Sequence, residues 1–140
     1  MAAIHDIQQE IVEEFELFDD WTDKYAYIID LGKQLPPMAE DHKSEETRIH
    51  GCQSNVWVYP ELSDGVLCLE GDSESAIVKG LVAMVLRVWN GQPPQEVAQC
   101  ELEFIETIGL KQHLSSTRSN GLASMIKQIQ RYAGERAAAS

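Results

Sequence analysis

The sequence predicts an α+β fold: a small antiparallel sheet, built as a three-stranded meander, with helices packed mainly on one face. Apolar residues recur at helical spacing in the first and last thirds of the chain, whereas β-branched and aromatic residues gather in the middle. The length of 140 residues suits one compact domain, and the chain has no internal repeat or long linker. We therefore expect a single domain over residues 1–140.

Two helices are expected before the sheet. From Ile4 to Leu17, apolar side chains recur at helical spacing with carboxylates between them. Asp20 suits the N-cap of a second helix, which should end near Gly32, because the proline pair at 36–37 cannot continue it. The polar, acidic residues 38–46 indicate a loop.

The middle of the chain predicts three strands. Residues 47–50 form a weak first strand, and residues 51–54 form the turn that leads into a stronger strand over 55–59. The segment 60–65, which ends in Asp-Gly, is typical of a hairpin loop, and residues 66–70 form the returning strand.

Helices follow the sheet. The segment Gly71-Asp72-Ser73 is expected to stop the last strand and to cap a helix from about Glu74 to Trp89. This helix is so apolar that it should be a central core element packed on the sheet. The later pieces are a short helix from Pro93-Pro94 to about Cys100, an apolar segment over 102–108, a last helix from Ser115 or Ser116, and a frayed tail over 134–140.

Composition and charge exclude several classes of partner. The 11 basic and 23 acidic side chains give a formal charge of −12, so nucleic acid and anionic membrane surfaces are not expected to bind. No apolar run reaches the ~20 residues that a membrane span needs. The first residues show no secretory signal, which favours the cytoplasm.

The strongest candidate for chemistry is Cys52, within Gly51-Cys52-Gln53-Ser54. A turn makes a thiol accessible, and glycine permits the close approach of a partner. The alternative is that Cys52 is a small buried apolar residue. His50 stands two residues earlier and would point to the same side of an extended segment as Cys52. A protonated His50 ring could there lower the pKa of the Cys52 thiol. The alternative is a histidine at a strand edge that has no role.

The other candidates carry weaker signals. Cys68 and Cys100 are expected to be structural, and no Cys-x-x-Cys or shared ligand spacing predicts a metal. Neither a phosphate-binding loop nor a dinucleotide fingerprint occurs, so no cofactor is expected. Glu74 suits the N-terminus of a helix, which does not prevent it from contacting a partner. Arg118 stands in a first helical turn, where the dipole disfavours a cation, so it could hold a loop or contact a partner.

Several sequence blocks together resemble the SufE family of sulfur acceptor proteins, in family order over about residues 15–130. The resemblance rests on Trp21-Thr22-Asp23-Lys24-Tyr25, Leu31-Gly32-Lys33-Gln34-Leu35-Pro36, Gly51-Cys52-Gln53-Ser54-Asn55-Val56-Trp57, Gly71-Asp72-Ser73-Glu74-Ser75-Ala76-Ile77-Val78-Lys79-Gly80-Leu81 and Leu114-Ser115-Ser116-Thr117-Arg118-Ser119-Asn120-Gly121-Leu122.

The resemblance implies an α+β fold similar to that of the iron–sulfur scaffold IscU, and a role as an accessory protein rather than an enzyme. Cys52 would accept sulfur from the persulfide of a pyridoxal-phosphate cysteine desulfurase (SufS-like), stimulate that enzyme, and deliver the sulfur to a cluster scaffold complex (SufBCD-like). The surface around 51–54, with His50, Glu74 and Arg118, would dock the partner. The alternatives are an IscU-like scaffold or metal-binding protein, a CsdE-type carrier for another sulfur pathway, and a pure interaction domain that acts without Cys52.

Overall fold

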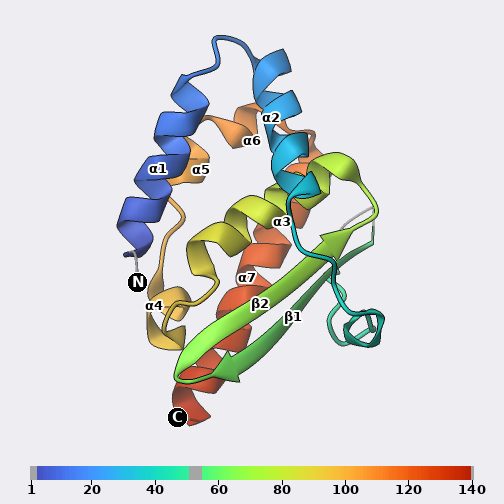
Figure 1. Ribbon diagram of the computed structural model, residues 1–140, viewed down its shortest axis with the longest axis vertical. Coiled ribbons are helices and arrows are strands. Elements are labelled where there is room, and N and C mark those ends of the chain that lie inside the picture. The colour runs from blue at the N-terminus through green and yellow to red at the C-terminus, as the bar shows by residue number, and fades with distance from the viewer. Residues whose placement is uncertain (1–2, 51–54, 140) are drawn as a thin grey trace.

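A long β-hairpin and one central helix form the middle of the molecule (Figure 1). The computed structural model describes residues 3–50 and 55–139. Strand β1 (Val56–Ser63) pairs antiparallel with strand β2 (Val66–Ser73). Asp64 and Gly65 join the strands with φ values of 51° and 79°, as the favoured two-residue hairpin turn requires. Helices pack on the hairpin, so the predicted α+β class is confirmed.

The sheet differs from the predicted meander. Within the described residues it has two strands, and the expected first strand over 47–50 is reduced to an isolated bridge between Arg48 and Trp57. The two strands are longer than expected. The predicted loop residue Pro60 lies in β1 opposite Leu69, and the predicted stop residue Gly71 lies in β2 opposite Val58.

The two faces of the hairpin differ in burial. Val58, Leu67 and Leu69 point into the hydrophobic core, because alternate residues of a strand share a face. Tyr59 and Glu70, which are paired in the register, lie on the opposite, outer face. The outer face is covered by the segment that contains a short 3-10 helix, Glu40–His42.

Helix α3 (Ala76–Trp89) is the central element, as predicted. Most of its residues are buried, and it runs along β2 and contacts α2, α1 and α7 (Figure 1). Its N-cap is Ser75, whose hydroxyl accepts a hydrogen bond from the Val78 N–H at 3.4 Å. The expected cap at Gly71–Ser73 is therefore wrong, because those residues continue the strand.

Two N-terminal helices cover α3. Helix α1 (Ile4–Glu16) is followed by α2 (Trp21–Lys33), and the Asp20 side chain accepts the Asp23 N–H at 2.9 Å, which confirms the predicted N-cap. Helices α2 and α3 cross where Gly32 meets Gly80, with the two backbones in direct contact.

The C-terminal part consists of three short helices and one long one. Helix α7 runs along β1 and continues through Ala139, so residues 134–139 are helical where the sequence analysis expects a frayed tail; Ala133, just before this stretch, is fully buried. The helices are α4 (Pro94–Gln99), α5 (Phe104–Thr107), α6 (Leu110–His113) and α7 (Ser116–Ala139). Among the described residues, none of the helices has the length and apolarity needed to cross a membrane.

Candidate functional site

The predicted acceptor Cys52 and its neighbours Gly51, Gln53 and Ser54 lie outside the described residues. The positions on either side are described and fixed. The Ile49 N–H donates to the Val56 carbonyl at 2.8 Å, and Ile49 is fully buried. The Val58 N–H donates to the Thr47 carbonyl at 2.9 Å. The chain is thus pinned to β1 just before this segment, although these bonds do not extend into a third strand.

Glu74 is joined to the residue that follows the Cys52 segment. The Asn55 side-chain amide donates to the Glu74 carboxylate, and the Glu74 N–H donates to the Asn55 carbonyl at 3.2 Å. Both residues are exposed. The pairing follows from the hairpin register, in which Val56 lies opposite Ser73, so the preceding and following residues also meet. Asn55 is not among the site residues that the sequence predicts.

His50, the residue before the segment, is exposed and contacts Arg48. Arg48 Nη2 lies 3.3 Å from His50 Nδ1, and its Nε donates to Glu45 at 3.1 Å. Because arginine only donates, His50 Nδ1 can form this hydrogen bond only as the acceptor. The sequence does not predict this contact, because Arg48 and His50 lie outside the helices and strands, where no repeating pattern indicates which side chains meet.

A group of side chains, here called the clasp, holds the chain before His50 against the outer face of the hairpin. The His42 ring stacks on Tyr59 with centroids 3.7 Å apart, and its Nδ1 lies 2.8 Å from Glu70 Oε2. Lys43 Nζ lies 2.9 Å from Asp72 Oδ2. The clasp consists of His42, Lys43, Tyr59, Glu70 and Asp72.

The charges of the clasp stabilise one another. Burial raises the pKa of Asp72, but hydrogen bonds from Lys43 and the Ser73 N–H, with the nearby charge of Lys79, outweigh it and hold this pKa below its ordinary value. Hydrogen bonds to Asp72 and Glu40 raise the pKa of Lys43. The clasp therefore contains an ionised pair, Lys43 and Asp72, at neutral pH. It holds the part of the chain that leads to His50 against the hairpin.

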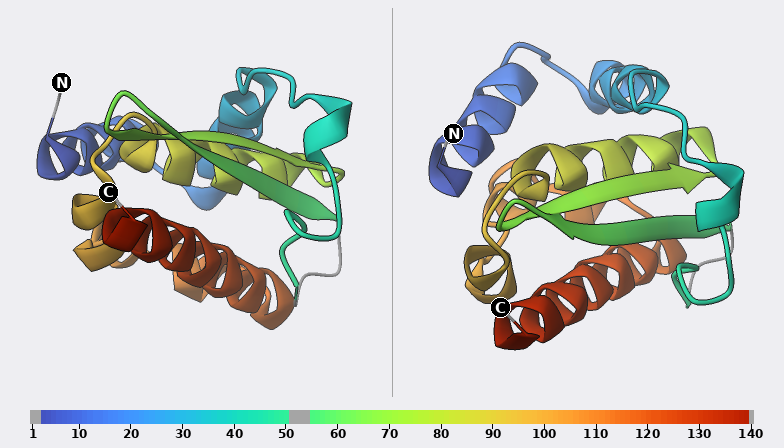
Figure 2. Two further views of the ribbon diagram at one scale, coloured as in Figure 1. Left: turned by 90° about the horizontal axis from the view of Figure 1, so that it is seen from below. Right: turned by 60° about the horizontal axis from the view of Figure 1, so that its bottom comes forward.

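Arg118 lies in the first turn of α7 and is exposed. Its N–H donates to the Ser115 hydroxyl at 3.2 Å, which confirms the predicted helix start. The beginning of α7, the beginning of β1 and the beginning of α3 lie at the same end of the molecule (Figure 2). Arg118, Glu74 and His50 thus share one end of the fold, while the described side-chain contacts join Glu74 to Asn55 and His50 to Arg48.

Cys68 and Cys100 are free thiols, and neither is fully buried. Burial raises the pKa of the Cys100 thiol; the Trp89 indole N–H beside it acts in the opposite direction, and Glu103 and Glu101 raise it further. Because both side chains are only partly buried, the two thiols are more accessible than a purely structural role suggests. In residues 3–50 and 55–139, no group of three histidine, cysteine or carboxylate side chains is placed to hold a metal ion.

The fold and the flanking geometry define an α+β protein in which the described residues on both sides of the Cys52 segment are held at one end of the hairpin. A family model described as "Fe-S metabolism associated domain", SufE, matches residues 9–133. The chain belongs to the SufE family, and so to a family associated with iron–sulfur metabolism.

Relatives and solved structures agree with this assignment. An uncharacterised SufE-like protein of Rhizobium etli is 44% identical over 135 residues, covering 93% of this chain and 91% of that protein. Another, from Rhizobium meliloti, is 42% identical over 125 residues, covering 86% and 89%. The solution structure of a hypothetical protein from Thermus thermophilus has a TM-score of 0.78 at 19% identity, covering 96% of this chain and 97% of that one, which shows the fold.

Proposed function

We propose that this protein is a sulfur carrier whose Cys52 accepts sulfur from a cysteine desulfurase and passes it to a cluster scaffold complex. The observation that carries the proposal is membership of the SufE family over residues 9–133, a range that contains Gly51-Cys52-Gln53. The protein would act as an accessory that stimulates the desulfurase, with the cytoplasm as the site of action.

The chemistry is exchange between sulfur atoms. The Cys52 thiolate attacks the terminal sulfur of a persulfide on the desulfurase, a new S–S bond forms at Cys52, and the S–S bond of the donor breaks. The donor leaves as a thiolate, so charge and electrons balance without an oxidant. This reaction needs an accessible thiol and few other catalytic groups, which agrees with the absence of a cofactor motif in the sequence.

The described surroundings support a docking surface at this end of the molecule. Glu74 is exposed and held by Asn55, so it presents a fixed carboxylate beside the segment. Arg118 offers an exposed cation at the start of α7. A partner that recognises both charges would align its persulfide with Cys52, and His50 would lie at the edge of the contact.

Mass spectrometry tests the acceptor. After incubation with a SufS-like desulfurase, pyridoxal phosphate and cysteine, we expect an added mass of ~32 Da per sulfur on Cys52. Cys68→Ala and Cys100→Ala serve as matched controls and should load normally. An unmodified wild-type protein, or an equal adduct on Cys52→Ala, would refute the proposal.

The docking surface has a separate test. Glu74→Lys and Arg118→Glu should each raise the concentration needed for half-maximal stimulation of the desulfurase, with a larger effect at low salt, because interface charges act mainly on association. Glu13→Lys, on the exposed face of α1, is the control. Equal effects of all three variants would contradict the proposed surface.

A further inference from the structure

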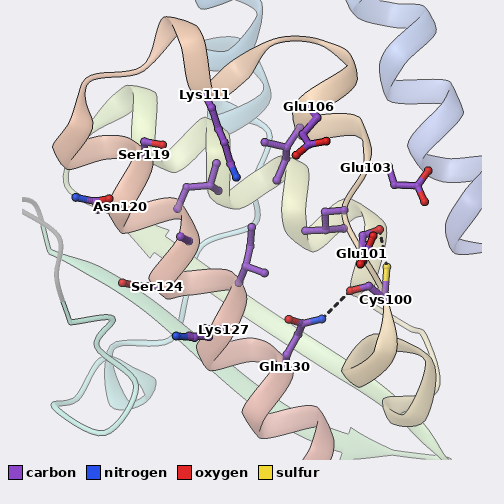
Figure 3. A pocket seen from close by; sticks show the side chains of 15 residues that line it. Cys100, Glu101, Glu103, Glu106, Lys111, Ser119, Asn120, Ser124, Lys127 and Gln130 are labelled. Atoms are coloured by element: carbon purple, nitrogen blue, oxygen red, sulfur yellow. Dashed lines mark hydrogen bonds between the residues drawn. The ribbon is translucent and has the colours of Figure 1, made fainter.

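A groove of about 730 Å³ lies between α7 and the chain that connects α4 to α6 (Figure 3). Its apolar lining comes from both sides. Ile105 and Leu122 are almost fully buried, Ile126 is half-buried, and Ala123 lies exposed on α7. The groove involves none of the residues assigned to the sulfur-accepting end.

Side-chain amides on both sides hold the walls of the groove. Gln130 of α7 donates to the carbonyls of Val97 and Cys100 at 3.2 and 2.7 Å. On the other side, the buried Gln8 of α1 accepts the Phe104 N–H at 3.1 Å. The side-chain amides of Gln130 and Gln8 are therefore used within the protein, where they hold the walls of the groove in place.

Charged side chains form the rim. Glu101 and Glu106 lie along one side, Lys127 lies on α7 across from them, and Lys111 reaches in at one end (Figure 3). Glu103 belongs to the same acidic side. All five are exposed, and within the described part of the chain none of them forms a salt bridge.

This arrangement fits a protein segment better than a small molecule. Small-ligand pockets direct a few polar groups inward to fix the ligand, whereas here the Gln130 amide is bonded within the protein and the charged side chains stand at the rim. An apolar centre with a polar rim is the pattern of a protein interface, and an open groove of this kind accepts the apolar face of a helix.

We propose that this groove binds an amphipathic helix of another protein, with its apolar face on Leu102, Ala123 and Ile126, the accessible apolar lining, and with basic residues along the edge that faces Glu101 and Glu106. The unpaired carboxylates select a basic edge by charge complementarity, in a chain whose formal charge is −12. The inference does not depend on sulfur transfer, since it concerns a different surface.

Two synthetic helices of about 14 residues test the proposal. Both carry leucines at i, i+3, i+4 and i+7; one has lysines along one edge, and the other has glutamates at the same positions. The lysine peptide should bind and should slow the alkylation of Cys100, which lines the groove, without protecting Cys68. No binding, equal binding of both peptides, or unchanged Cys100 alkylation would overturn the proposal.

Variants locate the binding. Ala123→Trp fills the groove from an exposed position and should weaken binding at least about tenfold, while Ala138→Trp, exposed elsewhere on α7, should not. The double variant Glu101→Gln/Glu106→Gln should weaken it about fivefold, against an unchanged Glu13→Gln/Glu16→Gln control. The double variant keeps the test valid if Ala123→Trp fails to fold. Equal losses of peptide affinity in a variant and its control would contradict binding in this groove. A wild-type dimer that Ala123→Trp dissociates would show that a second copy of this chain, and not another protein, occupies the groove.

Discussion

The contact between α2 and α3 gives the sharpest test of the packing, because it depends on a missing side chain. A Cβ atom added to Gly80 would lie 2.1 Å from the Ile28 carbonyl oxygen and 2.5 Å from its Cγ2. Ordinary contact begins at 3.4 Å, so the helices would have to separate by more than 1 Å. The obstructing atoms include backbone, which cannot rotate away.

The expected effect of Gly80→Ala follows from two opposing contributions. Overpacking a core costs about 1–3 kcal/mol, and a backbone clash belongs at the upper end. Alanine is favoured over glycine inside a helix by about 1 kcal/mol. The free energy of unfolding should therefore fall by about 2 kcal/mol, which lowers the melting temperature by roughly 5–10 °C in a domain of this size.

Gly134→Ala is the matched control within a helix. A Cβ at Gly134 meets nothing within 4 Å, so only helix propensity acts and the stability should rise by up to about 1 kcal/mol. Urea unfolding followed by circular dichroism measures both variants. If Gly80→Ala is as stable as the wild type, or if the two variants change stability in the same direction, the close helix contact is wrong.

Three further predictions concern polar contacts. Glu14 accepts two hydrogen bonds from Arg87, at 2.8 and 2.6 Å, and these bonds hold the pKa of its carboxyl below the ordinary value. Because the pKa of this carboxyl is lower in the folded than in the unfolded protein, the ion pair stabilises the fold at pH values above the unfolded pKa, and this stabilisation is lost as the pH falls. Glu14→Gln should therefore lower the free energy of unfolding by about 1 kcal/mol at neutral pH. In urea unfolding, its difference from the wild type should shrink below pH 4.5, the ordinary value for this carboxyl, and a constant difference would contradict the ion pair. Burial, and then the bond to Glu14, raises the pKa of Tyr27 to about 12, so an alkaline absorbance titration should contain a late step that Tyr27→Phe removes. Glu70→Ala should speed hydrogen exchange over residues 38–48 by opening the clasp, while α1 exchanges as before; equal exchange in both would refute the role of the clasp.

Local signals account for what the sequence predicts correctly. Asp20 has the chemistry of an N-cap, and its side chain bonds the Asp23 N–H as expected. The continuous apolar run of α3 identifies a helix buried on most sides, because no polar stripe is left for solvent. These features depend on a few neighbouring residues, so no knowledge of the fold is required to find them.

The predicted strand ends are wrong because Pro60 and Gly71, whose residue types predict turns, lie inside the strands. Pro60 lies within β1, where a two-stranded sheet leaves each strand one unpaired edge and a missing N–H can be tolerated. Gly71 lies beneath α3: a Cβ there would stand 2.6 Å from Val82 Cγ1, so the glycine lets the helix approach the strand. Only the tertiary contact distinguishes this glycine from one in a turn.

The error at the end of β2 also conceals part of the candidate site. A strand that stopped at Gly71 would leave Glu74 in the first turn of a helix, with capping as its main role. Because β2 continues to Ser73, opposite Val56, Glu74 instead meets Asn55 across the hairpin. The carboxylate is thereby fixed to the residue three positions after Cys52. Under the proposed function, Glu74 would contact the partner from a position that the hairpin register sets. Gly71→Val, which disturbs this register through the clash with Val82, should therefore raise the concentration needed for half-maximal desulfurase stimulation although it changes no surface charge, and unchanged stimulation would contradict this argument.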